Sequence, residues 1–498
     1  EYKWRFPYEM NQANFNGGFD SKINDNQGNY LYGEKELVYV QSIESKTQIA
    51  IFKYKNRLDE YEVLGENGGQ GNESMKKLIE ISLYSKRDLI ENGVDAVPIK
   101  TVHFDYNYSL QYGHPSHDQD IDYGDYNMKN SDGKLTLNNL YFTYKNHPKS
   151  KNNKYVFSYN NDFGYNNKDV DRWGGFKPNS SNPIDLNNTD FPYVIQQKSP
   201  NDNVKTNKDN YSGQWNLSNI KTLTGGDIKI YYESDDYAFV QDKQAMVMTS
   251  LSGVNAINQN ILYKKNIPYS VLFFKVPKGA NKANEHVQDS LLYLRAYVDL
   301  FNGYYEYVPC YLEVKKMELD KTTFKDYDIL KLTIKNSITK DKKGKPINAI
   351  TKSSIQFAKL HMNDLLTKDV NSKICSDTIT NKSENDLIKW SKDNVGLIGN
   401  YYSRRLNQEH AKIIDLDKSY ARLNDISYLK LGGGNRVKSI EIHDNWDEFT
   451  NGSSNSTFYA TDYFYTTELN GKNISSGVAS YEPKIGGDEN PFRKPVYY

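Results

Sequence analysis

The stretch Thr-Val-His-Phe-Asp-Tyr-Asn-Tyr-Ser-Leu at residues 101–110 alternates apolar and polar side chains. Its apolar members are Val102, Phe104, Tyr106, Tyr108 and Leu110. Successive side chains of a strand point to opposite faces of the sheet, so this pattern predicts a half-buried β-strand. The same period of two recurs at residues 140–144, 155–159, 228–232, 440–442 and 459–465.

Turn-forming pairs separate these runs. They are Asp132-Gly133, Gly225-Gly226 and Asn470-Gly471. The Asn-Gly pair is the strongest hairpin signal, because a type I′ turn needs positive φ at both central residues. We therefore predict a mainly β fold, made of Tyr-rich antiparallel sheets and hairpins with a small helical insert.

The composition also favours sheet. The 498 residues include 42 Tyr, and the aromatic fraction is 13% beside a hydrophobic fraction of 37%. Tyr favours pleated, half-buried surfaces, where its ring packs and its hydroxyl reaches water. Basic and acidic residues number 63 each, which removes the electrostatic argument for a nucleic-acid partner. No apolar run approaches the roughly 18 residues of a transmembrane helix, so we predict no membrane span.

At roughly 100–200 residues per domain, the length predicts three or four domains or one extended array. We expect an N-terminal β segment at 1–75, a main β-rich region at 76–349, a helical insert at 350–415, and a β-rich region at 416–498 that continues into a longer parent chain. In the first segment, the apolar runs at 37–40 and 49–52 are strand candidates.

Helical signals are few. The insert rests on the pair Ser383 and Asp386, which resembles a capping box, and on candidate helices at 353–360 and 404–411. Before the insert, Val287, Leu291, Leu294 and Val298 are spaced for one helical face, although residues 292–300 fit a strand equally well.

The densest set of possible metal ligands lies in one loop. Its members are His114, His117, Asp118, Asp120 and Asp122. Imidazoles and carboxylates at this density could hold a transition metal, and alternate carboxylates could hold calcium. The loop lacks the Gly and terminal Glu of an EF-hand and has no HExxH helix, so a solvated loop is the competing interpretation.

Three other features contain residue types that occur in catalytic or ligand-binding sites. Asp235 and Asp236 could serve as glycosidase carboxylates, but adjacent strand residues point to opposite faces. A strand, not a helix, is expected after the glycines at 432–434, which favours a turn or a close backbone approach over a phosphate loop. Cys310 and Cys375 lack CxxC spacing and either pair or stay buried thiols. We predict no catalytic residue and no cofactor.

Several stretches together resemble a known group of proteins. They are residues 98–106, 133–137 with 141–144, 171–174 with 177–178, 225–243, 431–434, and 475–483 with 489–492. These stretches resemble very large, mostly uncharacterised exported proteins of Bacteroidota, in the style of Rhs and YD-repeat proteins. The resemblance implies export, by the type IX route, to the cell surface or medium, and a curved β-rich wall of repeated hairpins. In Rhs proteins such walls enclose a toxic C-terminal segment.

Three functions stay open on this basis. The first is a non-enzymatic structural section of a secreted or cell-surface protein, a shell or scaffold that contacts other segments of its parent chain or other surface proteins. The second is an adhesin that binds a glycan or protein through exposed aromatic residues. The third is a hydrolase that uses Asp235, Asp236 or the loop at 114–122. We expect the first.

Overall fold

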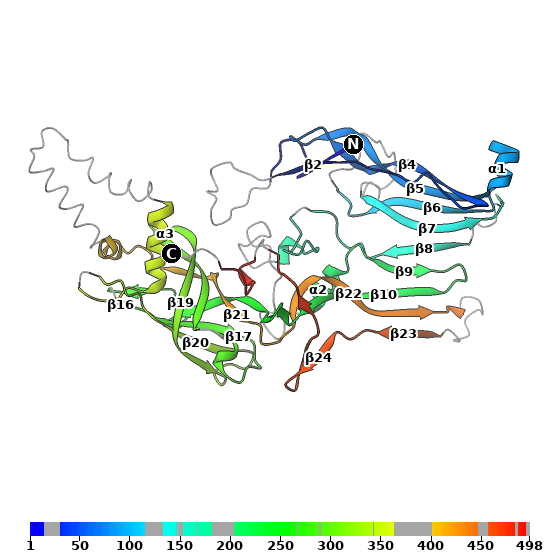
Figure 1. Cartoon of the computed structure of the whole chain (residues 1–498). Helices are drawn as coiled ribbons and strands as arrows, with labels where there is room; N and C mark the ends of the chain where they lie inside the picture. Colours follow the sequence, from blue (N-terminus) through cyan, green and yellow to red (C-terminus); the bar gives the residue numbers. More distant parts are fainter. Residues whose placement is uncertain are drawn as a thin grey trace, which may run out of the picture. The chain divides into compact units, whose positions relative to one another are not determined.

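The computed structural model describes residues 1–13, 30–114, 133–145, 147, 153–166, 168–181, 204–265, 267–287, 290–341, 343–362, 401–446, 457–483 and 487–494. The fold is mainly β, as predicted, with few helices (Figure 1). Two compact units divide the chain. The first contains Glu1–Ile195, Lys205–Asp235 and Gly432–Tyr465, and the second contains Gln196–Val204, Asp236–Leu431 and Thr466–Tyr498. In the described ranges, no helix has the length and apolar character needed to cross a membrane.

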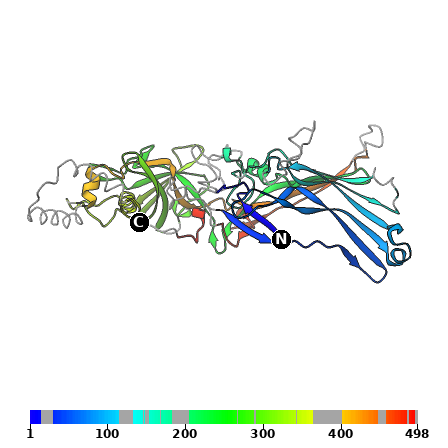
Figure 2. The same ribbon diagram turned by 90° about the horizontal axis from the view of Figure 1, so that it is seen from above.

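A large sheet forms the body of the first unit (Figures 1 and 2). It has ten strands, in the order β23-β22-β10-β9-β8-β7-β6-β5-β4-β3. Its strands are β3 (Ser42–Glu44), β4 (Gln48–Val63), β5 (Gln70–Ser85), β6 (Lys100–Leu110), β7 (Lys134–Thr143), β8 (Lys154–Tyr159), β9 (Leu217–Lys221), β10 (Asp227–Tyr237), β22 (Lys430–His443) and β23 (Phe458–Asp462). Successive strands from β3 to β10 pair antiparallel, as do β22 and β23.

The strand at 101–110 is confirmed as β6, but it has no single buried face. Thr101 and Tyr108, on opposite faces, are its two buried residues. The face of Thr101 is polar, since the Thr101 hydroxyl lies 3.2 Å from that of Ser82 and His103 Nε2 lies 2.8 Å from Thr143 Oγ1. The alternation therefore separates an aromatic face from a hydrogen-bonded polar face.

The other strand predictions have mixed outcomes. Residues 49–52 lie in β4, and the run at 459–465 is a strand only as far as Asp462. The prediction of a strand at 37–40 is wrong. There Val38 is 86% exposed, and the segment is attached through Tyr39, whose ring lies 5.3 Å from the ring of Tyr54. Too little of this run is buried to stabilise a paired strand.

Smaller elements complete the first unit. They are the antiparallel ribbon of β1 (Tyr2–Phe6) and β2 (Leu31–Lys35), the helices α1 (Lys86–Asn92) and α2 (Val204–Ser212), and the 3-10 turns η1 (Gly93–Asp95) and η4 (Asn179–Ser181).

The second unit contains a closed barrel of six antiparallel strands. They are β13 (Met246–Val254), β17 (Val271–Val276), β20 (Asp328–Ile334), β19 (Tyr304–Asp320), β18 (Leu291–Phe301) and β21 (Ile414–Asn424), and pairing of β13 with β21 closes the ring. The helical alternative for 287–298 is therefore wrong. Leu292, Leu294, Val298 and Leu300 share the barrel core with strand period, because each packs on the same side of β18.

Helix α3 (Ala349–His361) adds to that core. It covers the predicted helix at 353–360 and contributes Ile350, Ile355 and Phe357 to the hydrophobic cluster. Burying each such side chain is worth roughly 1.5–3 kcal/mol. Residues 401–407 are also helical, whereas Ser383 and Asp386 lie outside the described residues.

Short pairs complete the second unit. They are β11 (Phe239–Val240), β12 (Lys243–Gln244) and β26 (Val478–Ala479), then β14 (Ala256–Ile257) on β13, β15 (Tyr263–Lys264) with β16 (Ile267–Pro268), β24 (Thr466–Leu469) with β25 (Lys472–Ser475), and the turns η5 (Ala283–Glu285) and η7 (Gly487–Glu489). The Asn-Gly hairpin is confirmed: φ is 51° at Asn470 and 76° at Gly471, between strands paired at Leu469 and Lys472.

Candidate functional site

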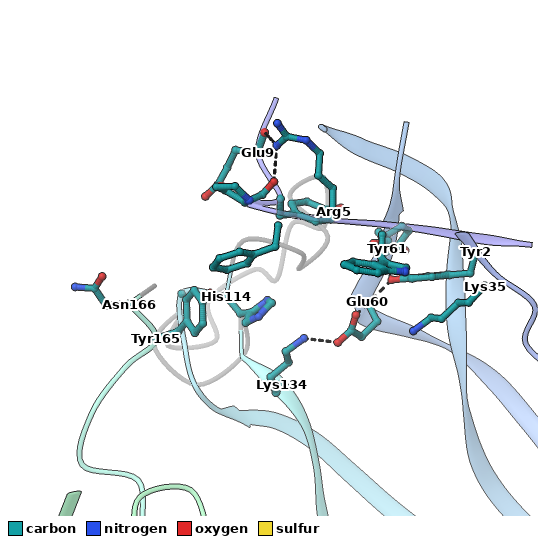
Figure 3. Close-up of a pocket in the computed structure, with 15 residues that line it drawn as sticks. Tyr2, Arg5, Glu9, Lys35, Glu60, Tyr61, His114, Lys134, Tyr165 and Asn166 are labelled. Atoms are coloured by element: carbon teal, nitrogen blue, oxygen red, sulfur yellow. Dashed lines mark hydrogen bonds and ion pairs between the residues drawn. The ribbon is translucent and has the colours of Figure 1, made fainter. Parts of the chain in front are cut away.

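A cavity of about 460 Å³ lies in the first unit, beside the β1–β2 ribbon (Figure 3). Its wall on the ribbon side is an aromatic row, because Tyr2, Trp4 and Phe6 occupy alternate positions of β1. Tyr2 is buried, but Trp4 and Phe6 keep 40% and 41% of their surface exposed. Trp4 faces Gly33 across the ribbon, where a Cβ atom would lie 2.7 Å from the indole. Gly33 therefore lets the indole lie flat against the backbone of β2.

An ion pair lies opposite this row. Lys134 of β7 contacts the carboxylate of Glu60 on β4, and the same ammonium donates to the Asp59 carbonyl at 3.4 Å (Figure 3). The Tyr2 hydroxyl donates to the Tyr61 carbonyl at 3.0 Å. Burial, followed by the Glu60 charge, raises the pKa of Tyr2, so its hydroxyl remains a donor at neutral pH.

A buried salt bridge fixes this part of β4. Arg57 binds the fully buried Asp59 through Nε at 2.9 Å and Nη2 at 2.6 Å, and Asp59 also accepts the backbone N–H of Leu135 at 2.7 Å. Burial by itself would raise the pKa of Asp59, but the hydrogen bonds and charge of Arg57 outweigh it, so the net pKa is lowered. The carboxylate thus ties β4 to β7 directly below the cavity.

The two ribbon cations that line the cavity, Arg5 and Lys35, differ in role. Arg5 is buried and donates to the backbone carbonyls of Glu66, Pro7, Glu9 and Gln12, so it holds the loop after β1. Lys35 is exposed, and its Nζ lies 4.9 Å from the centre of the Tyr2 ring. Lys35 is therefore the cation at this cavity that faces solvent.

The predicted metal loop contributes one described residue to this cavity. The His114 ring lies 4.5 Å from the Tyr165 ring at the cavity wall (Figure 3). His117, Asp118, Asp120 and Asp122 lie outside the described residues. Within the described part of the chain, no group of three His, Cys, Asp or Glu side chains is arranged to hold a metal ion.

The acidic candidates of β10 are held by structural contacts. Arg436 on β22 binds Glu233 through Nε at 2.8 Å and Asp235 through Nη1 at 3.0 Å. Glu233 and Asp235 share one face of β10, as residues two apart in a strand do. Asp236 is buried, and its carbonyl accepts the Ser475 hydroxyl at 3.0 Å.

The glycine triplet lies inside β22 and forms a close backbone approach, not a turn. All three residues have positive φ, and a Cβ atom at Gly432 would lie 2.6 Å from the indole nitrogen of Trp173. Trp173 follows Asp171, whose carboxylate accepts the backbone N–H of Trp173 at 2.9 Å and that of Gly175 at 3.0 Å. Two stretches of the resemblance, 171–174 and 431–434, thus pack against one another.

A second set of these stretches meets in the other unit. Lys430 is fully buried, and its ammonium lies 2.6 Å from Glu482 and 2.7 Å from Glu489, both also buried. The hydroxyl of buried Tyr237 donates to Glu482. These residues come from the stretches 225–243, 475–483 and 489–492, together with the residue before 431–434. The motifs that carry the resemblance therefore serve packing and folding.

The cysteines form no described site. Cys310 is buried in the barrel core, and this burial raises the pKa of its thiol to about 12. Its thiol donates to the Val308 carbonyl at 3.6 Å. Cys375 lies outside the described residues, so the choice between pairing and free thiols stays a prediction.

Sequence reasoning missed the aromatic cavity. The period of two in Tyr2, Trp4 and Phe6 was a visible signal, but Glu60 and Lys134 belong to strands that only the sheet register brings together. Searches for similar proteins add no further guide: no family model, curated protein or solved structure matches the chain.

Proposed function

We propose that this chain is a non-enzymatic structural section of a large secreted or cell-surface β-protein of the Rhs-like style, a scaffold whose ten-stranded sheet is continued by strands from other segments of the parent chain. The observation that carries the proposal is the open edge of the sheet at β23.

Among the described residues, β23 is the last strand of the sheet and pairs with β22 alone, from Phe458 opposite His443 to Asp462 opposite Ser439. All five of its residues are exposed, and Phe458 and Tyr459 keep 60% and 68% of their surface. In an antiparallel edge strand, alternate backbone groups point away from the sheet and offer a template for another strand.

Proteins usually protect such edges with Lys, Pro or a bulge. β23 (Phe-Tyr-Ala-Thr-Asp) contains neither Lys nor Pro, and its register against β22 runs without a shift. At the opposite end of the sheet, β3 has only three residues, and a short strand is itself a common protection of a sheet edge. The edge at β23 is therefore the one that can accept a further strand. The structural use of the resemblance motifs supports the same function.

Hydrogen exchange tests this proposal. In the isolated chain, the outward backbone amides of 458–462 should exchange rapidly, whereas in the longer parent protein a neighbouring strand should protect them by about a hundredfold or more, as in paired sheet. Strand β20 of the barrel, which is paired on both sides, is the internal control and should be equally protected in both proteins. Equal, rapid exchange of 458–462 in both proteins would refute the proposal.

A further inference from the structure

We propose that the cavity beside β1 binds a saccharide that carries a carboxylate, such as a uronic acid unit. This inference is independent of the open sheet edge, because it rests on different residues of the first unit.

The aromatic row supplies a surface for the apolar face of a sugar. Trp4 and Phe6 are two residues apart on one strand, so their rings lie roughly 7 Å apart along it, about the span of one or two pyranose rings. Both rings are part-exposed at the cavity wall, and the absence of a side chain at Gly33 leaves room for the Trp4 indole against β2. Flat, half-exposed aromatic surfaces with polar neighbours suit ligands that have one apolar and one polar face.

Polar groups of the cavity match the hydroxyls of a sugar. The Glu60 carboxylate can accept hydroxyl hydrogen bonds, and the Lys134 ammonium beside it can donate. The Asn166 side-chain carbonyl accepts the Lys168 backbone N–H at 3.0 Å. The NH₂ group of Asn166 is therefore the part of this side chain that can donate to a ligand at the rim of the cavity. A small number of polar groups in a mainly aromatic cavity fixes ligand orientation.

Charge selects an acidic sugar. Lys35 lies at the cavity on the Tyr2 ring, and among the described residues no carboxylate lies within 4.0 Å of its ammonium. Lys134 and Arg5 add two more positive charges to the wall. The wall also contains two negative charges, those of Glu60 and Glu9, so the positive charges outnumber the negative ones. A cationic ligand would be repelled by Lys35, whereas a carboxylate on the sugar would pair with it.

The probe is a hexamer of galacturonic acid, with its methyl ester as the matched neutral ligand, and calorimetry gives the affinity. We expect the acid to bind about fivefold more tightly than the ester, as for an exposed ion pair. Lys35→Gln should lower the affinity for the acid about fivefold, to that for the ester, because the ion pair is lost. Trp4→Ala should weaken both ligands about tenfold or more, while Trp4→Phe retains binding.

Two variants elsewhere in the first unit are controls. Trp446→Ala and Lys46→Gln change exposed residues of the same types outside the cavity and should leave both affinities unchanged. Circular dichroism of Trp4→Ala establishes that the unit is folded. Absence of binding, or binding that Trp4→Ala and the control variants affect equally, would overturn the site. Equal affinity for acid and ester would overturn the role of charge.

Discussion

Lys430 is a single residue whose buried ion pairs contribute much to the stability of the structure around it. Its ammonium is fully buried between the carboxylates of Glu482 and Glu489. Buried charges are tolerated only when they are paired and hydrogen-bonded, since removing one partner leaves uncompensated charge in the interior. The C-terminal stretch that contains both acids is therefore tied to the second unit by this cation.

We predict that Lys430→Met lowers the free energy of unfolding by about 3–5 kcal/mol, because two carboxylates lose their cation. The matched control is Lys412→Met, which removes a surface pair with Glu409 and should cost at most about 1 kcal/mol. Urea unfolding followed by circular dichroism measures both. Equal losses in the two variants would show that the buried cluster contributes no more than a surface pair.

The burial of His286 predicts that the free energy of unfolding depends on pH. His286 is 1% exposed, and burial lowers its pKa to about 4, partly offset by the charge of Glu285. The unfolded chain, with an ordinary pKa of about 6.5, takes up the proton first, so stability is complete above pH 6.5 and falls as the pH drops towards 4.

The difference between the two pKa values corresponds to a loss of about 3 kcal/mol over that pH range. In His286→Gln this contribution disappears, so the stability difference between wild type and variant should shrink or reverse as the pH is lowered. Urea unfolding at pH 7, 5.5 and 4 checks this. Parallel pH profiles for the two proteins would mean that His286 is not held neutral by the fold.

At the scale of elements, helix α3 depends on Asn348, the residue that caps its N-terminus. The Asn348 side-chain oxygen accepts the backbone N–H groups of Ile350 at 2.8 Å and Thr351 at 3.1 Å, and its amide donates to the Tyr269 carbonyl. An N-cap of this kind satisfies donors that have no partner within the helix. Because α3 shares the barrel core, the cap also supports the barrel.

Asn348→Ala should destabilise the second unit by about 2 kcal/mol, the cost of a lost cap together with a lost buried hydrogen bond. Asn348→Ser keeps a capping oxygen but loses the donor to Tyr269, so it should cost less than Asn348→Ala. Thermal unfolding ranks the variants. If serine costs as much as alanine, the cap is not the contribution that matters.

A second prediction at the scale of elements concerns the cost of replacing two glycines of β22. Gly432 and Gly434 both have φ above 100°, but only a Cβ atom at Gly432 would collide with Trp173. Gly432→Ala should therefore cost about 1–3 kcal/mol more than Gly434→Ala, the usual cost of overpacking. Chemical unfolding of the first unit, followed by Trp fluorescence, makes the comparison. Equal costs would mean that backbone strain alone explains both glycines.

Local patterns predicted these elements better than their assembly. The period of two identified β6, β7, β8 and β10, and the Asn-Gly pair identified its turn, because side-chain alternation and positive φ are local properties. Closure of the barrel depends on β13 pairing with β21, from Met246 opposite Asn424, which no local signal encodes. For the same reason, the cavity that joins Trp4 to Glu60 and Lys134 was not predicted.

At the scale of the whole molecule, burial is unevenly distributed. The hydrophobic cluster lies in the barrel of the second unit, whereas the sheet of the first unit combines half-buried aromatics with polar contacts and ends on exposed strands. Open, aromatic sheet edges favour pairing with another chain. The structural role proposed above, in which the sheet continues into other segments, would account for the exposed edge at β23.

A cryo-EM map of the longer parent protein expected from the resemblance tests the proposed function most directly. We expect a strand hydrogen-bonded to β23 along residues 458–462, with Phe458 and Tyr459 packed against it. A map in which β23 ends the sheet and faces solvent along its whole length would contradict the proposed function.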